Sequence, residues 1–227
     1  MLEGLIYQFV YNLERHSLFE VRLRRWLILL CLILPAALWF GRWGATRLVA
    51  SLVTAGAAIL LGAIWQADRQ HYVRFVPGSS PEPEQTSAPL SPLPAMSKTP
   101  LRASGFFEVS GMRRYFVEAP ATYTTFETGE HCVMTQVPFS RFLLLGTSER
   151  GEVGWWYTFF QPAMLSTVTA GRLYFGLRPR LALQLQIAST HDKAETLYVS
   201  FEDVTTRSLI LADLLHDAAD GVGLHHA

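Results

Sequence analysis

Two long apolar runs separated by a short connection dominate the hydrophobic pattern of the chain. The second run, residues 48–67, contains no charged side chain, and the first, residues 26–41, lies between Arg25 and Arg42. A bilayer core about 30 Å thick is spanned by roughly 20 helical residues. Soluble core helices seldom lack charge on every face. The pattern therefore favours a transmembrane helical hairpin over residues 26–67 rather than a buried hairpin of a soluble protein.

Residue types within the hairpin indicate an anchor or packing element. The candidate helix-packing positions are small residues at helical spacing: Ser51, Ala55, Ala58 and Gly62. Such a stripe allows close approach of the two helices, or of a helix from a partner. Tryptophans near the run ends suit the headgroup level: Trp26, Trp39, Trp43 and Trp65. Neither run contains Asp, Glu, Lys or His, the ionisable groups on which transport paths depend.

Flanking arginines predict the orientation of the hairpin. The short connection holds Arg42 and Arg47, whereas Arg69 and Arg74 follow the second run and four arginines precede the first: Arg15, Arg22, Arg24 and Arg25. Positive residues concentrate on the cytoplasmic side. We therefore expect an integral protein of the inner (plasma) membrane with two spans and both termini in the cytoplasm. The first run lies far from the N-terminus and no small-residue cleavage signal follows it, so we expect an uncleaved anchor.

The first 25 residues predict an amphipathic surface helix. Apolar side chains recur at helical spacing: Leu2, Leu5, Ile6, Phe9, Val10 and Leu13. This face suits the membrane interface, with Tyr7 and Tyr11 near the headgroups, and equally suits docking on a protein partner. The basic end of the segment, including Arg22 and Arg24, is expected to meet lipid phosphates.

A proline-rich stretch follows the hairpin. Residues 76–104 contain seven prolines among Ser, Thr, Glu and Ala residues. Such a composition buries little apolar surface, and proline stiffens it toward an extended conformation. We therefore expect a semi-rigid linker that holds a C-terminal domain away from the bilayer.

Residues 105–217 predict a β-rich domain closed by a helix. Period-two patterns rich in β-branched and aromatic residues indicate strands. The predicted strands are 106–109, 113–118, 131–136, 141–147, 154–160, 164–169, 172–176, 180–187 and 196–202. Helical spacing then predicts a helix over 204–217 with Asp203 as its N-cap. Glycines 221 and 223 are expected to break it, leaving a flexible tail over 218–227. The fold class is thus an α+β membrane protein with a small antiparallel barrel or sandwich.

Three segments of this region carry a family resemblance. They are a central-strand pattern over 141–147, a strand before a turn over 172–176, and a strand leading into the helix over 196–203. In these the region resembles the pleckstrin-homology-like domains of bacterial membrane proteins, in which two helices also accompany a barrel. The resemblance implies binding of lipid headgroups or proteins rather than catalysis. Residues 118–130, the expected loop after the first strand, hold no Lys or Arg, unlike relatives that bind phosphoinositides.

Two groups of residues are candidate contacts for a partner or lipid. The densest aromatic run contains Trp155, Trp156 and Tyr157, followed by Phe159 and Phe160. Strand side chains alternate between faces, so either Trp155, Tyr157 and Phe159 or Trp156 and Phe160 must face away from the core. The basic group, Arg172, Arg178 and Arg180, flanks a predicted turn and suits an acidic partner or headgroup.

No catalytic, cofactor or metal site is expected. His131 and Cys132 are neighbours on a predicted strand and point to opposite faces, so we expect an exposed histidine and a buried cysteine. The residues His216, Asp217, Asp220, His225 and His226 could ligate a metal, but a terminal segment rarely forms a rigid site. Cys31 and Cys132 lie too far apart for an internal disulfide.

The chain has 19 basic and 19 acidic residues, so no global field attracts nucleic acid. The sequence predicts a non-enzymatic accessory or scaffold subunit of a membrane assembly, whose partners are the lipid bilayer and a membrane protein. The alternative is a membrane-tethered domain that senses a lipid or ligand.

Overall fold

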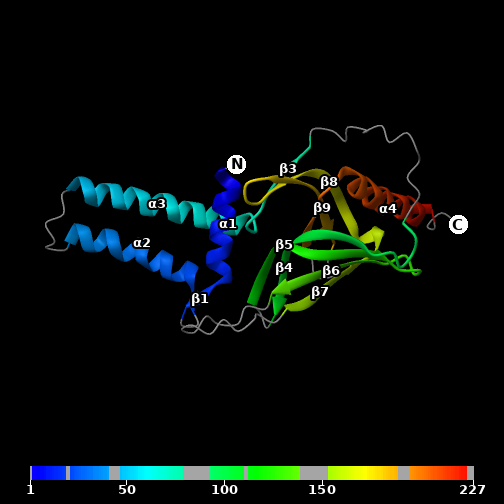
Figure 1. The fold of residues 1–227 in the computed structure, drawn as a ribbon, viewed down its shortest axis with the longest axis horizontal. Helices are drawn as coiled ribbons and strands as arrows, with labels where there is room; N and C mark the ends of the chain where they lie inside the picture. Colours follow the sequence, from blue (N-terminus) through cyan, green and yellow to red (C-terminus); the bar gives the residue numbers. More distant parts are fainter. Residues whose placement is uncertain are drawn as a thin grey trace.

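The chain folds into a helical hairpin, a transverse N-terminal helix and a large antiparallel sheet (Figure 1). The computed structural model describes residues 2–18, 21–40, 47–78, 93–109, 112–138, 153–188 and 195–223. The helices are α1 (Leu2–Arg15), α2 (Leu23–Phe40), α3 (Arg47–Arg69) and α4 (Val204–Gly223), with a 3-10 turn η1 (Pro162–Met164). The strands are β1 (Ser17–Leu18), β2 (Val21–Arg22), β3 (Arg74–Pro77), β4 (Thr99–Val109), β5 (Met112–Thr125), β6 (His131–Pro138), β7 (Val153–Phe160), β8 (Leu165–Tyr174), β9 (Pro179–Ile187) and β10 (Glu195–Phe201).

The two apolar runs form the hairpin of α2 and α3. The helices lie side by side, and both join the rest of the molecule at the same end (Figure 1). The 23 residues of α3 extend about 35 Å. Only 6% and 11% of the two apolar windows are buried, and Leu32, Phe40 and Ile59 are strongly exposed. Both helices are thus long and apolar enough to cross a membrane, and the described part of the chain does not enclose them.

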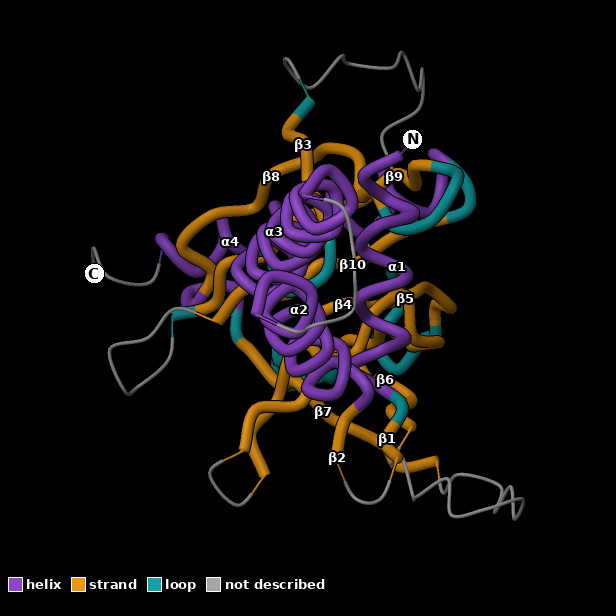
Figure 2. The backbone as a smooth tube through the Cα atoms, turned by 90° about the vertical axis from the view of Figure 1, so that its left-hand side faces the viewer, coloured by secondary structure: helices purple, strands orange, loops and turns teal. Residues whose placement is uncertain are grey.

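Helix α1 lies across the base of the hairpin, against the sheet (Figures 1 and 2). Its buried apolar side chains are Tyr7, Val10 and Tyr11. They share a cluster with Ile64 and Ala67 of α3 and with Val117, Leu173 and Ala182 of the sheet. The tyrosines expected at the headgroups are therefore enclosed by protein. The expected surface helix over 1–25 ends at Arg15, and the short hairpin of β1 and β2 follows it.

Two arginines that we expected to meet lipid phosphates are instead paired within the protein. Arg22 forms an ion pair with Glu14, a residue of α1 that is only 8% exposed. Arg24 places Nε at 3.2 Å from Glu14 Oε2 and Nη1 at 2.8 Å from Asp68 Oδ1. A buried carboxylate requires such partners. These pairs join α1, α2 and α3 at the base of the hairpin, and Arg25 stays exposed.

Helix α3 ends in a turn of two residues with left-handed backbone, His71 (φ 54°) and Tyr72 (φ 62°). The Tyr72 N–H donates to the Ala67 carbonyl at 2.8 Å, a bond typical of helix ends that turn through this region. Glycine usually takes such positions, because a Cβ costs about 1–2 kcal/mol there. Side-chain contacts offset this cost. The Tyr72 hydroxyl accepts from Arg24 Nη1 at 2.6 Å and donates to Asp68 at 3.0 Å.

The turn directs the chain straight from the hairpin into the sheet. β3 follows at Arg74 and pairs with β8, and the ring of Tyr72 packs on Tyr115 of β5 at 5.0 Å. Part of the expected linker, residues 76–104, is therefore strand, because β3 ends at Pro77 and β4 begins at Thr99. The domain is not held off the hairpin by a spacer. Residues 79–92, which include most of the prolines, lie outside the described residues.

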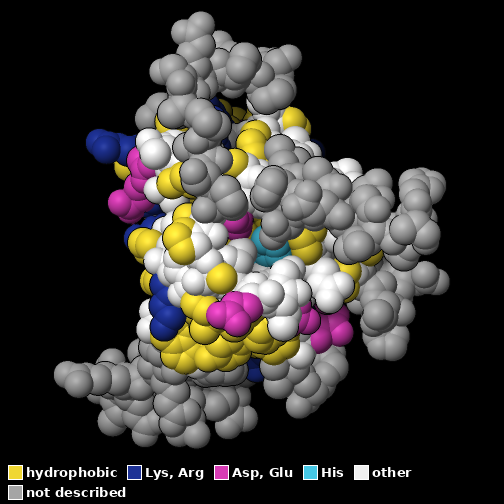
Figure 3. Space-filling view, turned by 90° about the vertical axis from the view of Figure 1, so that its right-hand side faces the viewer, with side chains coloured by type: hydrophobic (Ala, Val, Ile, Leu, Met, Phe, Trp, Pro, Cys, Tyr) yellow, Lys and Arg dark blue, Asp and Glu magenta, His cyan; other side chains and the backbone are white. Residues whose placement is uncertain are grey.

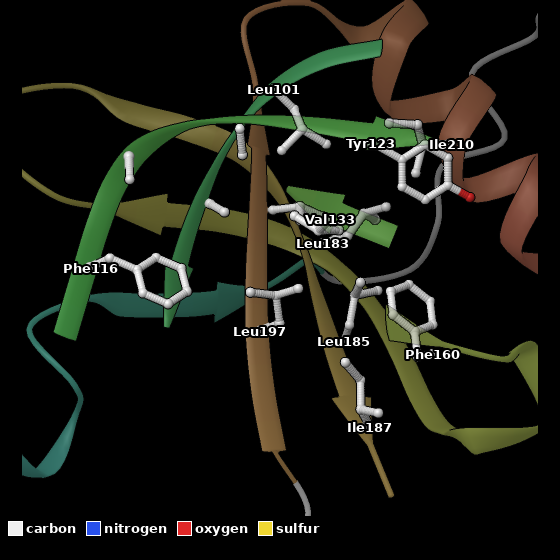
Figure 4. Close-up of a cluster of buried hydrophobic side chains, with 14 of the residues drawn as sticks. Leu101, Phe116, Tyr123, Val133, Phe160, Leu183, Leu185, Ile187, Leu197 and Ile210 are labelled. Atoms are coloured by element: carbon white, nitrogen blue, oxygen red, sulfur yellow. The ribbon is translucent and has the colours of Figure 1, made fainter. Parts of the chain in front are cut away.

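One eight-stranded antiparallel sheet forms the domain, in the order β3-β8-β9-β10-β4-β5-β6-β7. The described strands do not close it into a barrel, so the expected barrel is an open curved sheet. One face packs on α1 and α3, and the other packs on α4. That second face carries the main core, a cluster that includes Phe116, Leu183 and Leu197 of the sheet (Figure 4) and Ile210 and Leu214 of α4.

Several predicted boundaries differ from the structure. The strands predicted at 164–169 and 172–176 form one continuous strand, β8, because Ala170 and Gly171 pair with β9 rather than turning. β5 continues to Thr125, so most of the expected loop over 118–130 is strand. α4 continues through the glycines to Gly223, whereas Asp203 caps it as predicted, accepting from the Thr206 N–H at 2.7 Å. The predicted strand at 141–147 lies outside the described residues.

The turn after α3 gives a test of the junction. Replacing Tyr72 with Phe removes a buried hydroxyl bonded to two charged groups, so we expect unfolding to become easier by about 1.5–3 kcal/mol. Thermal and urea unfolding of the full chain in detergent would measure this. Tyr157→Phe, on the exposed face of β7, is the matched control and should change stability by less than about 0.5 kcal/mol. Equal effects of the two variants would contradict the proposed role of Tyr72.

Candidate functional site

The aromatic run on β7 divides between the two faces of the sheet. Trp155, Tyr157 and Phe159 are 52%, 49% and 55% exposed. Trp156 faces inward and stacks on Phe107 with ring centroids 4.8 Å apart, and Phe160 is buried in the core. Strand alternation therefore leaves the three odd-numbered residues at the surface, which decides between the two arrangements that the sequence left open.

Residues distant in the sequence enlarge this surface. The ring centroid of Phe159 lies 6.1 Å from that of Phe126 and 6.2 Å from that of Tyr157. Met96, 58% exposed, lies at the same end. We call Trp155, Tyr157, Phe159, Phe126 and Met96 the aromatic strip. Sequence reasoning missed both Phe126 and Met96. The pairing of β5, β6 and β7 brings Phe126 toward β7, and the Met96 N–H donates to the Thr125 carbonyl at 2.7 Å, which holds Met96 beside the end of β5.

A shallow hollow of about 610 Å³ lies at one end of the aromatic strip. Met96, Phe126 and Phe159 supply its apolar wall, and Glu127 and Glu130 supply exposed carboxylates. Figure 3 views the end of the molecule remote from the hairpin and shows a band of hydrophobic side chains bordered by acidic ones. An exposed apolar area with a polar rim is typical of a protein-docking surface.

Behind the strip lies a buried polar cluster. The Tyr123 hydroxyl donates to Asp213 Oδ2 at 2.6 Å and lies 2.6 Å from His131 Nδ1. Because its one proton goes to the carboxylate, Nδ1 of His131 carries the hydrogen of the second bond. The Leu93 N–H donates to Asp213 Oδ1 at 3.1 Å. Figure 4 shows Tyr123 reaching from the sheet toward α4 beside Ile210. The cluster joins α4 to β5 and β6.

The expected exposure of His131 is wrong, because this side chain is fully buried and stacks on Phe160 at 5.5 Å. A buried imidazole needs hydrogen-bond partners, and Tyr123 supplies one across the sheet. Cys132 is also buried, as predicted, at 1% exposure, and burial raises the pKa of its thiol to about 11. Neither side chain is accessible to a substrate, so the pair has no catalytic arrangement.

The basic group lies on the opposite half of the sheet from the aromatic strip. Arg172 on β8 and Arg178 in the β8–β9 turn are exposed. Arg180 is engaged within the protein, with Nε 3.0 Å from Glu118 Oε2 and Nη1 3.5 Å from Glu202 Oε1. Strands β10, β4, β5 and β6 separate these arginines from β7, so the two sets of candidate contacts do not form one site.

Glu118 is the most enclosed carboxylate of this basic region. Burial raises its pKa, and the hydrogen bond from Ser200 at 2.7 Å and the charges of Arg180 and Arg102 lower it by less. Its backbone has φ 50° and its N–H donates to Ser104 at the bulge in β4. Glu118 therefore has a structural role, because its contacts with Ser104, Arg180 and Ser200 join β5 to β4, β9 and β10.

The small-residue stripe lies on the open side of the hairpin. Ser51, Ala55, Ala58 and Gly62 are all exposed, and a Cβ added at Gly62 would meet nothing within 4 Å. The contact between α2 and α3 uses other positions, including a hydrogen bond from Trp39 Nε1 to Thr54 Oγ1 at 3.1 Å. The stripe is therefore available to another helix and does not join the two helices of this hairpin.

A hollow of about 380 Å³ lies beside the end of α3. Arg69, His71 and Arg74 border it, together with Gln184 and Tyr198 of the sheet. Arg74 is paired with Glu3 of α1, and the pKa of His71 is lowered by burial and by Arg113. The ring of His71 therefore favours the neutral form, and the charge of this hollow is modest.

Within the described residues, no group of three or more His, Cys, Asp or Glu side chains could hold a metal ion. Of the tail residues considered as ligands, His225 and His226 lie outside the description, as do the side chains of His216, Asp217 and Asp220. No protein-family model, curated protein or solved structure matches the chain. Its function is therefore inferred from its own surfaces.

Thiol labelling tests the burial of Cys132. With a pKa of about 11, only about one thiol in a thousand is ionised at pH 8. In a Cys31→Ala variant, we expect a water-soluble maleimide to leave the folded full-length chain unmodified and to modify it once denatured. Mass spectrometry measures the fraction of molecules modified in each state. Rapid modification of the folded protein would show that the β6 face is open at Cys132.

Glu118 gives a pH test. Because its folded pKa lies above the unfolded value of 4.5, the folded state binds this proton more tightly. Its contribution to stability is therefore fully present below pH 4.5 and is lost as pH rises through the folded pKa. We expect the wild type to gain stability relative to Glu118→Gln as pH falls from 7 to 5, measured by thermal unfolding of both proteins. A constant difference across this range would rule out the raised pKa.

Proposed function

We propose that this protein is a non-enzymatic, membrane-anchored accessory or scaffold subunit of a larger membrane assembly. The hairpin of α2 and α3 spans the inner membrane with both termini in the cytoplasm, and the sheet carries the aromatic strip to a protein partner. The attachment of both spans to the domain at one end supports termini on the same side. The arginines beside that end support the cytoplasm.

The exposed surface of the hairpin favours contact with a membrane protein as well as with lipid. An apolar helix surface of this extent requires an apolar environment. The stripe of Ser51, Ala55, Ala58 and Gly62 faces away from α2 and lets a second backbone approach closely. A helix of a neighbouring membrane protein fits this side of α3.

The aromatic strip is the observation that carries the proposal. Trp and Tyr are the residues that most often dominate binding energy in protein interfaces, and Trp155 and Tyr157 are half-exposed on β7, the last strand of the described sheet. Glu127 and Glu130 border the hollow at the end of the strip. A partner segment with apolar side chains flanked by Lys or Arg would complement this surface.

Native purification tests the proposal. We would extract tagged full-length protein in mild detergent, weigh the native particle and identify its components. We expect a stoichiometric complex. Serine replacement of both Trp155 and Tyr157 should release the partner, because truncation of a central aromatic contact costs about 2 kcal/mol or more, roughly thirtyfold in affinity for each residue.

The matched control is the double variant Arg172→Ala and Arg178→Ala, which alters an exposed surface on the other half of the sheet. It should retain the complex. A strip variant that keeps its partner while its unfolding temperature stays normal would contradict docking on β7. Wild-type protein that emerges alone would contradict the scaffold function itself.

The second candidate is a pleckstrin-homology-like domain that senses a lipid or ligand at the membrane. The exposed side chains of Arg172 and Arg178 favour it, whereas the pairing of Arg180 with Glu118 and Glu202 removes one expected contact. This function requires the arginine variant, and not the strip variant, to lose binding.

A further inference from the structure

Helix α1 has two apolar faces, and the protein covers one of them. Tyr7, Val10 and Tyr11 are buried against the sheet and α3. On the opposite side of the helix, Leu5 and Phe9 are 40% and 53% exposed. Ile6 and Leu13 flank them and are half-buried. At 100° per residue these four side chains belong to the stripe that the sequence analysis predicted, whereas Val10 of that stripe is buried. This second face points away from the protein.

Contacts with α3 fix the position of α1 along the hairpin axis. Its buried face packs on Ile64 and Ala67, within one turn of Trp65, which is 62% exposed and carries the Arg69 guanidinium over its ring at 4.5 Å. Exposed tryptophan and arginine at the end of an apolar helix mark the headgroup level. Helix α1 therefore lies at that level when the hairpin spans a bilayer.

The β8–β9 turn reaches the same level. The Gly176 N–H donates to the Gly4 carbonyl at 2.8 Å, and a Cβ on Gly4 would lie 2.3 Å from the Gly176 carbonyl oxygen. This close approach holds the turn against the start of α1. The next two residues, Leu177 and Arg178, are exposed, the leucine at 58%. An exposed apolar side chain beside a guanidinium suits the boundary between acyl chains and phosphates.

From these observations we infer that the outer face of α1 and the tip of the β8–β9 turn form a second membrane-contact surface, seated in the lipid interface beside the hairpin. We define this surface by Leu5, Phe9 and Leu177, with Arg178 at its edge. The inference rests on the proposed membrane anchoring. Figure 2 looks along the hairpin toward the sheet and shows α1 beside α2 and α3.

A lipid occupant fits this surface better than a protein. The surface lies across the hairpin axis (Figure 1), as a helix in the plane of the membrane does. A protein partner would have to occupy the headgroup layer to reach it. The sheet lies on the other side of α1, so insertion of the outer face leaves every contact of the buried cluster intact.

Spin labelling of the full chain tests the inference. Single cysteines would replace Phe9, Leu177, Arg15, Glu127 and Leu52 in a Cys31→Ala background, with the buried Cys132 retained. Each labelled protein is placed in vesicles of phosphatidylcholine and phosphatidylglycerol. Collision rates with oxygen, which dissolves in lipid, and with a water-soluble nickel complex are measured for each label. Leu52, exposed on α3, is the reference for lipid, and Arg15 and Glu127 are references for water.

The inference requires labels at 9 and 177 to favour oxygen, as the label at 52 does, while those at 15 and 127 favour nickel. Labels at 9 and 177 that favour nickel, with 52 still in lipid, would overturn the second contact surface and leave the anchoring intact. A label at 52 that favours nickel would overturn the anchoring itself. An immobile label at 9 that meets neither reagent would show that protein covers the surface, which also overturns the inference.

Discussion

The left-handed turn at His71 and Tyr72 is the constraint on which the rest of the structure depends. It ends α3 and starts β3 within a few residues, so the hairpin and the sheet share one junction instead of being joined by a flexible segment. Its backbone is unfavourable for residues with a Cβ. The contacts of the buried Tyr72 side chain with Arg24, Asp68 and Tyr115 offset the free-energy cost of this backbone conformation. Arg24 brings α2 to the junction, and its ion pair with Glu14 brings α1.

This junction separates two kinds of surface. Toward the hairpin, several charged side chains are paired within the protein, and Glu14 forms ion pairs with both Arg22 and Arg24. On the remote end the aromatic strip stays open, and the buried cluster of Tyr123, His131 and Asp213 holds α4 behind it. Because hydrogen bonds link Tyr123 to both His131 and Asp213, and so join α4 to β5 and β6, the sheet beneath the strip is a firm support. A firm support reduces the ordering cost of binding a partner.

Local pattern was enough to predict the two apolar helices, the Asp203 cap, the alternation of β7 and most strand positions. It failed where a partner distant in the sequence decides the outcome. His131 is buried because Tyr123, itself bonded to Asp213, provides a hydrogen-bond partner. Tyr7 and Tyr11 are buried because the sheet covers them. Local pattern did not predict a strand from Arg74 to Pro77, because this stretch becomes a strand only through its pairing with β8. The proline composition next to it suggested a spacer, since composition says nothing of where the ends of a segment are fixed.

The unequal lengths of the two hairpin helices have a mechanical consequence. α2 has 18 residues and α3 has 23, so a bilayer that matches one helix mismatches the other, and tilting is the ordinary response to mismatch. Because β3 and α1 fix the sheet to the base of the hairpin, the sheet turns with the helices. If the hairpin spans a bilayer as proposed, the thickness of that bilayer would set the angle at which Trp155 and Tyr157 are presented, and the hairpin would act as a lever as well as an anchor.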